Sequence, residues 1–170
     1  MNTQERGETT HTLSILVDNE PGVLSRVAGL FSGRGFNIAS LSVAETMDPR
    51  ISRITAVLPG NEMILEQIKK QLNKLINVHK VIDITDLPRV ERELALLKVN
   101  AKNGDRPEVL RIVDIFRGKV VDVSPHDFTI EVTGDRDKIG AILALLSKFG
   151  ISEIAKSGIT ALPRSKKGEK

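Results

Sequence analysis

The residues best suited to bind a small ligand lie between positions 18 and 26, where a strand pattern gives way to a helical one. Pro21 and Gly22 at a helix start leave backbone N–H groups uncovered, and the positive end of a helix attracts a carboxylate. Asn19 offers a carbonyl for an ammonium and an amide for a carboxylate, and the two apolar residues that follow Gly22 supply a wall. These groups suit a free aliphatic α-amino acid, although the same residues are equally typical of a plain turn with a helix cap.

Catalytic and metal-binding groups are sparse in the rest of the sequence. The chain has no Cys, which excludes thiolate nucleophiles, disulfides and Cys-based zinc sites. His11, His79 and His126 are not spaced as ligands on one element. His126 and Asp127 could act as a base with its orienting acid, but His and Asp are also common turn formers. A minor enzyme using this pair stays open as an alternative.

The elements that must position the ligand-binding turn follow from the periodicity of residues 13–86. The pattern predicts strand, helix, strand, strand, helix and strand, in that order. Right-handed crossovers close this order into a four-stranded antiparallel sheet with both helices on one face, which is the ferredoxin-like arrangement. The predicted elements are a strand at 13–17, a helix at 22–33, strands at 36–44 and 51–58, a helix capped by Asn61 and running to Ile76, and a strand at 81–84.

The second half of the chain repeats the order of elements. Strands are predicted at 93–101, 119–123, 128–133 and 151–162, with helices over 109–116 and 139–146 capped by Asp105 and Asp135. The fold class is therefore α+β, with two ferredoxin-like βαββαβ domains in tandem. The expected boundaries are a polar leader at 1–10, a first domain at 11–86, a linker at 87–92, a second domain at 93–163 and a basic tail at 164–170.

Charge and hydropathy give no sign of nucleic-acid or membrane binding. The formal net charge of +3 resides in residues 164–170, so the body of the chain is neutral. A ferredoxin-like RNA binder displays aromatic rings on its sheet, and this chain has five Phe and no Tyr or Trp. The longest apolar run, at 139–146, is far shorter than the roughly 20 residues of a membrane helix. We therefore expect a cytoplasmic protein with no nucleic-acid or membrane partner.

Several motifs spread over both halves of the chain resemble those of one known family. They begin with Asn-Glu-Pro-Gly-Val-Leu-Ser-Arg-Val at 19–27 and Leu-Phe-Ser-Gly-Arg-Gly-Phe-Asn-Ile at 30–38. They continue at 41–44, 52–55, 66–75 and 90–94, and the resemblance covers roughly residues 11–164. The whole set resembles the small, regulatory subunit of acetohydroxyacid synthase (acetolactate synthase) with its N-terminal ACT domain. Because the resemblance extends over both halves, it points to this subunit rather than to ACT domains in general.

The resemblance implies regulation rather than catalysis. In this family the small subunit activates a separate catalytic large subunit, which uses thiamine diphosphate, Mg and FAD, and confers feedback inhibition by valine in branched-chain amino acid biosynthesis. No cofactor or metal is expected on this chain. The resemblance further implies a homodimer in which ACT domains pair side by side and bind valine at their interface. The implied effector-binding residues are Asn19, Glu20, Pro21, Gly22, Val23, Leu24, Asn37 and Ile38.

Four questions stay open from the sequence. It does not distinguish valine from leucine or isoleucine as the main effector, or a dimer from a larger oligomer. It also does not indicate which surface contacts the large subunit, or whether the second domain binds a ligand. A stand-alone metabolite sensor without a large subunit would need the same turn.

Overall fold

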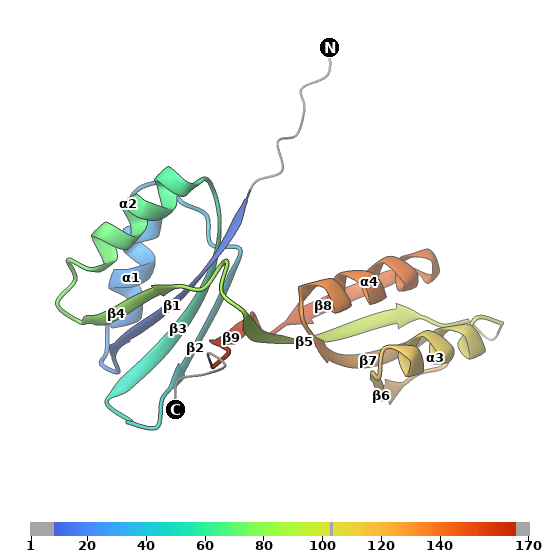
Figure 1. The fold of residues 1–170 in the computed structure, drawn as a ribbon. Helices are drawn as coiled ribbons and strands as arrows, with labels where there is room; N and C mark the ends of the chain where they lie inside the picture. The colour runs from blue at the N-terminus through green and yellow to red at the C-terminus, as the bar shows by residue number, and fades with distance from the viewer. Residues whose placement is uncertain (1–8, 103, 166–170) are drawn as a thin grey trace, which may run out of the picture. The chain divides into compact units, whose positions relative to one another are not determined.

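The structure is a computed structural model that describes residues 9–102 and 104–165 (Figure 1). These residues divide into two compact units, one formed by 9–90 with 161–165 and the other by Glu91–Thr160. Most of the predicted leader (1–8) and of the predicted basic tail (166–170) lies outside the described residues.

The first unit has the predicted ferredoxin-like topology. Its strands pair in the order β2-β3-β1-β4, every neighbouring pair is antiparallel, and both helices cover one face (Figure 1). The strand β2 therefore lies at an edge of the sheet, as predicted. The elements are β1 (Thr10–Asp18), α1 (Val23–Ser32), β2 (Ser40–Glu45), β3 (Ile51–Pro59), α2 (Glu62–Leu72) and β4 (Val78–Asp83).

The core of the first unit holds α1 against the sheet. Alternate residues of β1, such as Leu13 and Ile15, are fully buried beneath the helices, because successive side chains of a strand point to opposite faces. Val27 and Phe31 of α1 are buried in the same cluster. Burying a large apolar side chain contributes about 1.5–3 kcal/mol, so these contacts hold α1 against the sheet.

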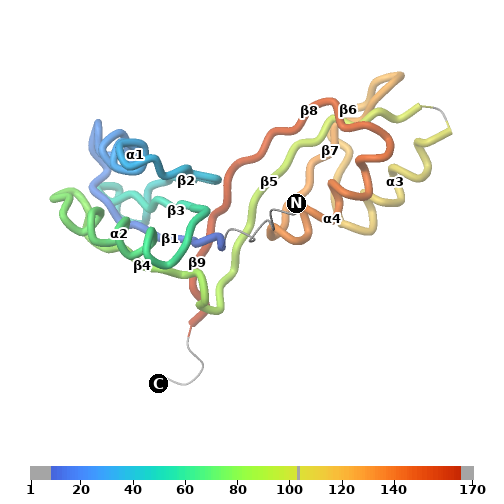
Figure 2. Tube along the Cα trace, turned by 90° about the horizontal axis from the view of Figure 1, so that it is seen from above, coloured from blue at the N-terminus to red at the C-terminus, as the bar shows by residue number. Residues whose placement is uncertain are grey.

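The second unit repeats this plan. Its strands pair in the order β6-β7-β5-β8, and β9 pairs with β5; Figure 2 shows β8 running beside β5. The elements are β5 (Arg89–Asn100), α3 (Arg106–Ile115), β6 (Lys119–Val123), β7 (Asp127–Gly134), α4 (Arg136–Leu146), the 3₁₀ turn η1 (Ser147–Phe149), β8 (Ile151–Lys156) and β9 (Thr160–Pro163). The strand β5 begins inside the segment 87–92 that is expected to be a linker, and residues 161–163 belong to the first unit.

The two halves also share a detail of their backbones. The pairing of β1 with β4 shifts register after Leu16, and that of β5 with β8 shifts after Lys98. Just beyond each shift the last residue of the central strand donates its N–H to the loop before the edge strand. Asp18 donates to the carbonyl of Asn77, and Asn100 to that of Gly150, both at 2.9 Å. This match makes the two loops structural equivalents.

One predicted boundary is wrong at β2, which begins at Ser40 rather than at residue 36. After α1, Gly35 has a φ of +70° and the N–H of Phe36 donates to the carbonyl of Phe31 at 3.0 Å. This bond closes the helix in a Schellman-type turn, so Phe36 serves to end the helix. Asn37 and Ile38 consequently lie in a loop before β2.

Three further predictions are corrected by the structure. The helix α2 ends at Leu72, and Ile76, predicted on its apolar face, is 91% exposed. The last predicted strand is two strands, β8 and β9, separated by a segment in which Gly158 has a φ of +82°. Asp105 makes no side-chain cap to α3, because its backbone is already helical, whereas Asp135 accepts from the N–H of Lys138 at 2.9 Å as predicted.

Candidate functional site

The start of α1 presents free backbone N–H groups beside open space. Gly22 has a φ of +85°, which favours glycine, and a Cβ built on it would meet no atom within 4 Å. The N–H of Val23 donates to the carbonyl of Glu20 at 3.3 Å. In residues 9–102 and 104–165, the N–H groups of Leu24 and Ser25 have no acceptor. Two adjacent amides at a positive helix end can therefore bind a carboxylate.

Asn19 is held in place by the hairpin between β2 and β3. Its side-chain Nδ2 donates to Glu45 Oε1 at 3.2 Å and to the carbonyl of Pro49 at 2.9 Å, and its backbone N–H donates to the carbonyl of Arg50 at 2.7 Å. Because Nδ2 is already engaged, the group that Asn19 can still offer is Oδ1, an acceptor suited to an ammonium. Of the two roles that the sequence suggests for this amide, the structure favours the one as acceptor.

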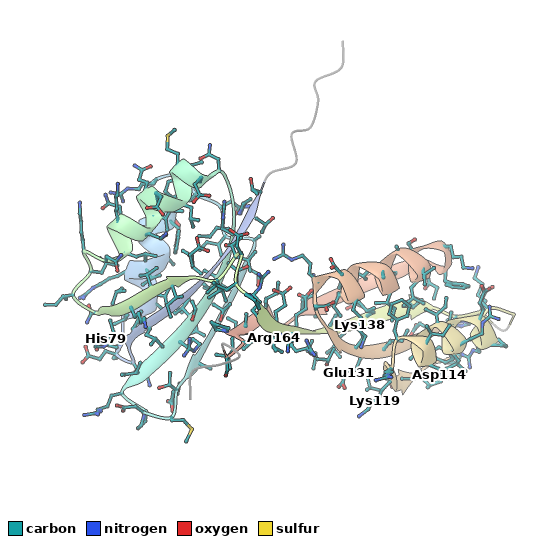
Figure 3. All side chains as sticks on the ribbon, in the orientation of Figure 1. His79, Asp114, Lys119, Glu131, Lys138 and Arg164 are labelled. Atoms are coloured by element: carbon teal, nitrogen blue, oxygen red, sulfur yellow. The ribbon has the colours of Figure 1, made fainter. Side chains whose placement is uncertain are left out.

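A network of side chains that the sequence analysis missed holds the turn from the other side. Asp18 accepts from Asn77 Nδ2 at 2.9 Å and contacts His79 Nε2 at 2.6 Å; Figure 3 labels His79. Arg26, in the first turns of α1, donates to Asn77 Oδ1 at 2.6 Å. The hydrogen bond from Asn77, together with that to His79, lowers the pKa of Asp18 below its ordinary value of 3.8.

The apolar residues after Gly22 face in different directions. Val23 is 3% exposed and belongs to the core, so it can offer a ligand only its backbone. Leu24 is 42% exposed and is the side chain that can form an apolar wall. Glu20 and Pro21 are exposed at the turn itself.

Asn37 and Ile38 lie beyond the other end of α1. A helix of ten residues is about 15 Å long, so one small molecule cannot touch both the turn at Gly22 and these two residues in one chain. Asn37 is exposed, and Ile38 is half-buried against the core. The structure thus brings Asn19, Gly22 and Leu24 together, and leaves Asn37 and Ile38 apart from them.

Comparisons with known proteins match both halves of the chain. Residues 13–80 match the family described as "AHAS small subunit-like ACT domain", and residues 92–165 match "Small subunit of acetolactate synthase". Acetolactate synthase small subunits from Aquifex aeolicus and Mycobacterium bovis are each 54% identical, over 91% and 94% of this chain and 81% and 95% of theirs. The chain belongs to the acetolactate synthase small-subunit family.

A solved structure of this family has the same fold. The crystal structure of the acetolactate synthase small subunit from Thermotoga maritima superposes with a TM-score of 0.83 at 46% identity, covering 93% of this chain and 99% of that one. These matches confirm the resemblance, the tandem ferredoxin-like fold and the ACT domain. The relatives are small subunits of acetolactate synthase and not its catalytic subunit, as the resemblance implies.

The backbone of the alternative catalytic pair, His126 and Asp127, belongs to a tight turn. The backbone N–H groups of His126 and Asp127 both donate to Ser124 Oγ, at 3.1 and 3.0 Å, which shapes the turn between β6 and β7. Across the described part of the chain, no three His, Asp or Glu side chains are grouped to hold a metal ion. None of the helices described is long and apolar enough to span a membrane.

Proposed function

We propose that this chain regulates a catalytic large subunit of acetolactate synthase and binds valine between the ACT domains of two copies. The observation that carries the proposal is the pair of uncovered amides at Leu24 and Ser25, next to the free Oδ1 of Asn19. An α-amino acid carries a carboxylate, which can accept from the two amides, and an ammonium, which can donate to Asn19 Oδ1.

Each part of valine has a counterpart at the turn. The carboxylate accepts from the two amides, the ammonium donates to Asn19 Oδ1, and the branched side chain packs on the exposed part of Leu24. Asn37 and Ile38 of a second copy close the other side, since those of the same chain follow the far end of α1, a helix of ten residues and about 15 Å. The edge position of β2 supports this pairing, because an edge strand can accept a further strand.

Regulation follows from linkage between valine and the arrangement of the two copies. Valine bound between the copies favours one geometry of the pair, and the large subunit is more active with the other. A coupling of about 1–3 kcal/mol would change activity about 5–150-fold. The large subunit supplies the thiamine diphosphate, Mg and FAD chemistry, and this chain needs no cofactor. The complex works in branched-chain amino acid biosynthesis in the cytoplasm.

Reconstitution tests the proposal directly. The full chain is titrated into a purified catalytic large subunit of acetolactate synthase, and acetolactate formation is measured with and without valine, leucine or isoleucine. We expect activation that saturates with the small chain and inhibition by valine. If the chain binds valine but never changes the large subunit's activity, it is a stand-alone sensor and the regulatory proposal fails.

A pair of matched substitutions tests the site itself. Leu24→Asp places a carboxylate next to the free amides, where it competes with that of valine, and we expect the valine response to be lost while activation persists. Leu110→Asp is the control, because Leu110 is 41% exposed on α3 of the other unit, one residue after the buried Val109 just as Leu24 follows Val23. Equal loss of the valine response in both variants would contradict the site.

A further inference from the structure

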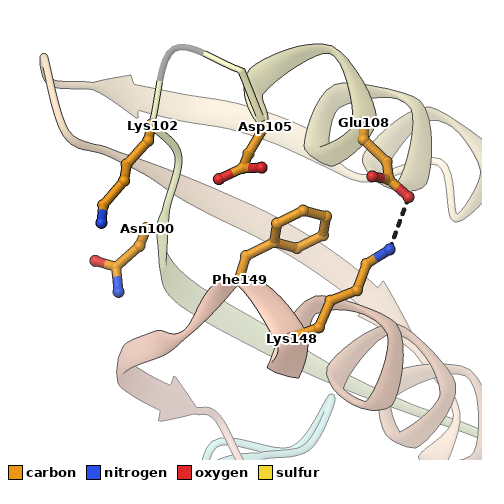
Figure 4. Close-up of a pocket in the computed structure, with 6 residues that line it drawn as sticks. All are labelled: Asn100, Lys102, Asp105, Glu108, Lys148 and Phe149. Carbon is orange, nitrogen blue, oxygen red and sulfur yellow. Dashed lines mark hydrogen bonds and ion pairs between the residues drawn. The ribbon is translucent and has the colours of Figure 1, made fainter.

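The second unit has a hollow at the place that corresponds to residues 19–25 of the first unit, the proposed effector turn. The equivalence follows from the bond between Asn100 and Gly150, which matches that between Asp18 and Asn77. The hollow has a volume of about 460 Å³, within the usual range for small-molecule sites. Figure 4 shows the six side chains that line it, which are Asn100, Lys102, Asp105, Glu108, Lys148 and Phe149.

On one side of the hollow, Lys148 and Glu108 neutralise each other in an ion pair. Lys148 Nζ lies 2.7 Å from Glu108 Oε1 and 4.9 Å from the centre of the Phe149 ring. In Figure 4 this ion pair lies across the Phe149 ring from Lys102 and Asn100. The pair offers a ligand one acceptor and one donor at fixed positions, while the ring offers a flat apolar surface.

The other side carries two charges of opposite sign. Among the residues that the structure describes, neither Lys102 Nζ nor the Asp105 carboxylate has a side-chain or backbone partner. The absence of a cap from Asp105 to α3 is notable, because an Asp at this position usually caps the free amides. Asp105 is only partly exposed, and in Figure 4 its carboxylate faces the hollow.

We propose that this hollow is a second ligand site, separate from the effector turn, and that it binds a free α-amino acid with a polar side chain. The ligand's carboxylate pairs with Lys102 and its ammonium with Asp105. Its side chain lies over Phe149 and exchanges hydrogen bonds with the Glu108–Lys148 pair. The proposal does not depend on valine binding in the first unit.

The lining argues against the two obvious alternatives. A phosphate would face the unpaired carboxylate of Asp105, and like charges at contact distance repel. The branched side chain of valine could pack only on the Phe149 ring, because the rest of the lining is polar. It would remove water from those polar groups without offering them hydrogen bonds, which costs free energy. An amide or hydroxyl side chain satisfies both members of the ion pair.

Asn100 completes the hollow, and Gly150 allows it to do so. A Cβ built on Gly150 would lie 2.6 Å from Asn100 Nδ2, so any larger residue at this position would displace the Asn100 amide. Gly150 also has a φ of +90°, which favours glycine. The Asn100 amide can therefore add a hydrogen bond to a ligand carboxylate next to Lys102.

Amide-resolved NMR of the full-length chain tests the proposal. L-glutamine, L-asparagine and L-serine are added one at a time, and L-valine and inorganic phosphate serve as comparison probes. We expect at least one of the three polar amino acids to shift the backbone amides of Lys102, Phe149 and Gly150 in a saturable way. If none of the three does so, or if phosphate or valine shifts these amides more strongly, the proposal is wrong.

Two variants link the shifts to the proposed charges. Lys102→Ala and the nearly isosteric Asp105→Asn should each weaken the binding of the polar amino acid at least tenfold. Lys119→Ala is the control, because Lys119, labelled in Figure 3, is an exposed lysine on β6 of the same unit and is not among the residues that line the hollow. The dispersion of each variant's spectrum reports whether it is folded. Unchanged affinity in folded Lys102→Ala and Asp105→Asn would overturn the proposal.

Discussion

Substitution by alanine should change the unfolding free energy in opposite directions at Gly22, just before α1, and at Gly29, inside α1. Gly22 precedes α1 with a φ of +85°, where an L-residue costs about 1–2 kcal/mol. No atom lies within 4 Å of the added methyl group, so this cost is backbone strain alone. Gly29 lies inside α1 with equally open surroundings, and alanine there stabilises a helix by about 1 kcal/mol. The two variants should therefore differ by about 2–3 kcal/mol in unfolding free energy.

Urea unfolding of the full chain measures this difference, and thermal unfolding provides a second measure. A change of 1 kcal/mol shifts the Tm of a 60–100-residue domain by about 4–8 °C, so Gly22→Ala should melt lower and Gly29→Ala higher than the parent chain. The reasoning about the turn is refuted if Gly22→Ala is as stable as Gly29→Ala.

Measuring valine affinity distinguishes an effect of Gly22→Ala on the ligand site from its effect on stability. The methyl group added by Gly22→Ala stands next to the amides that receive the carboxylate, so calorimetric titration should show valine binding at least tenfold weaker, about 1.4 kcal/mol. Gly29→Ala should bind valine as the parent does. Parent-like binding by folded Gly22→Ala would show that the carboxylate lies elsewhere.

Three further outcomes follow from the contacts. Asn77→Ala removes two side-chain hydrogen bonds that hold the effector turn, and should cost about 1–2 kcal/mol in urea unfolding and weaken valine binding. The side-chain hydrogen bond and ion pair with Arg50 lower the pKa of Asp48 from 3.8 to about 2. The stabilisation of the folded state by this pair is therefore present above pH 3.8 and is lost as the pH falls toward 2. Asp48→Asn should flatten acid unfolding over that range. Asp135→Ala should cost about 1 kcal/mol through loss of its cap, whereas Asp105→Ala, with no cap to lose, should leave stability unchanged.

Strands and helices with a strict period could be predicted from the sequence. The alternation of apolar residues along β1 and β5 places Leu13 and Leu97 in the cores, because one face of each sheet is covered by helices. Asn61 was predicted to cap α2, and its Oδ1 accepts from the N–H of Ile64 at 3.0 Å. In each case the signal lies within a few residues of its effect.

The errors arose where a local pattern competed with the end of an element. Phe36 and Ile38 have strand-forming side chains, but the turn at Gly35 uses Phe36 to close α1. Ile76 continues the helical period of α2, yet the N–H of Leu75 already bonds the carbonyl of Leu72 in a tight final turn, and the helix stops. Periodicity records where a side chain could be buried, and does not record where the backbone leaves the helix.

The candidate site was only partly accessible to the same reasoning. The Pro-Gly turn and Asn19 are visible in the sequence because they are adjacent. The partners of Asp18 are not, since Asn77 and His79 follow it by 59 and 61 residues and meet it only after β1 and β4 have paired. The burial of Val23 also depends on packing, because a helix start in isolation exposes it as readily as Leu24.

If valine binds as proposed, the contacts of Asn19 would connect the ligand physically to the edge of the sheet. Asn19 Nδ2 donates to Glu45, the last residue of β2, while its Oδ1 is the group proposed to accept from the ligand's ammonium. An ammonium bound at Oδ1 therefore acts on a side chain that also holds the end of the edge strand. The strand β2 lies at the edge of the sheet, so in the proposed dimer this one amide would couple ligand binding to the geometry of the pair. Asn77 donates to Asp18 and accepts from Arg26, and these bonds hold the opposite side of the turn, so we expect any displacement on ligand binding to reach the edge strand rather than the core.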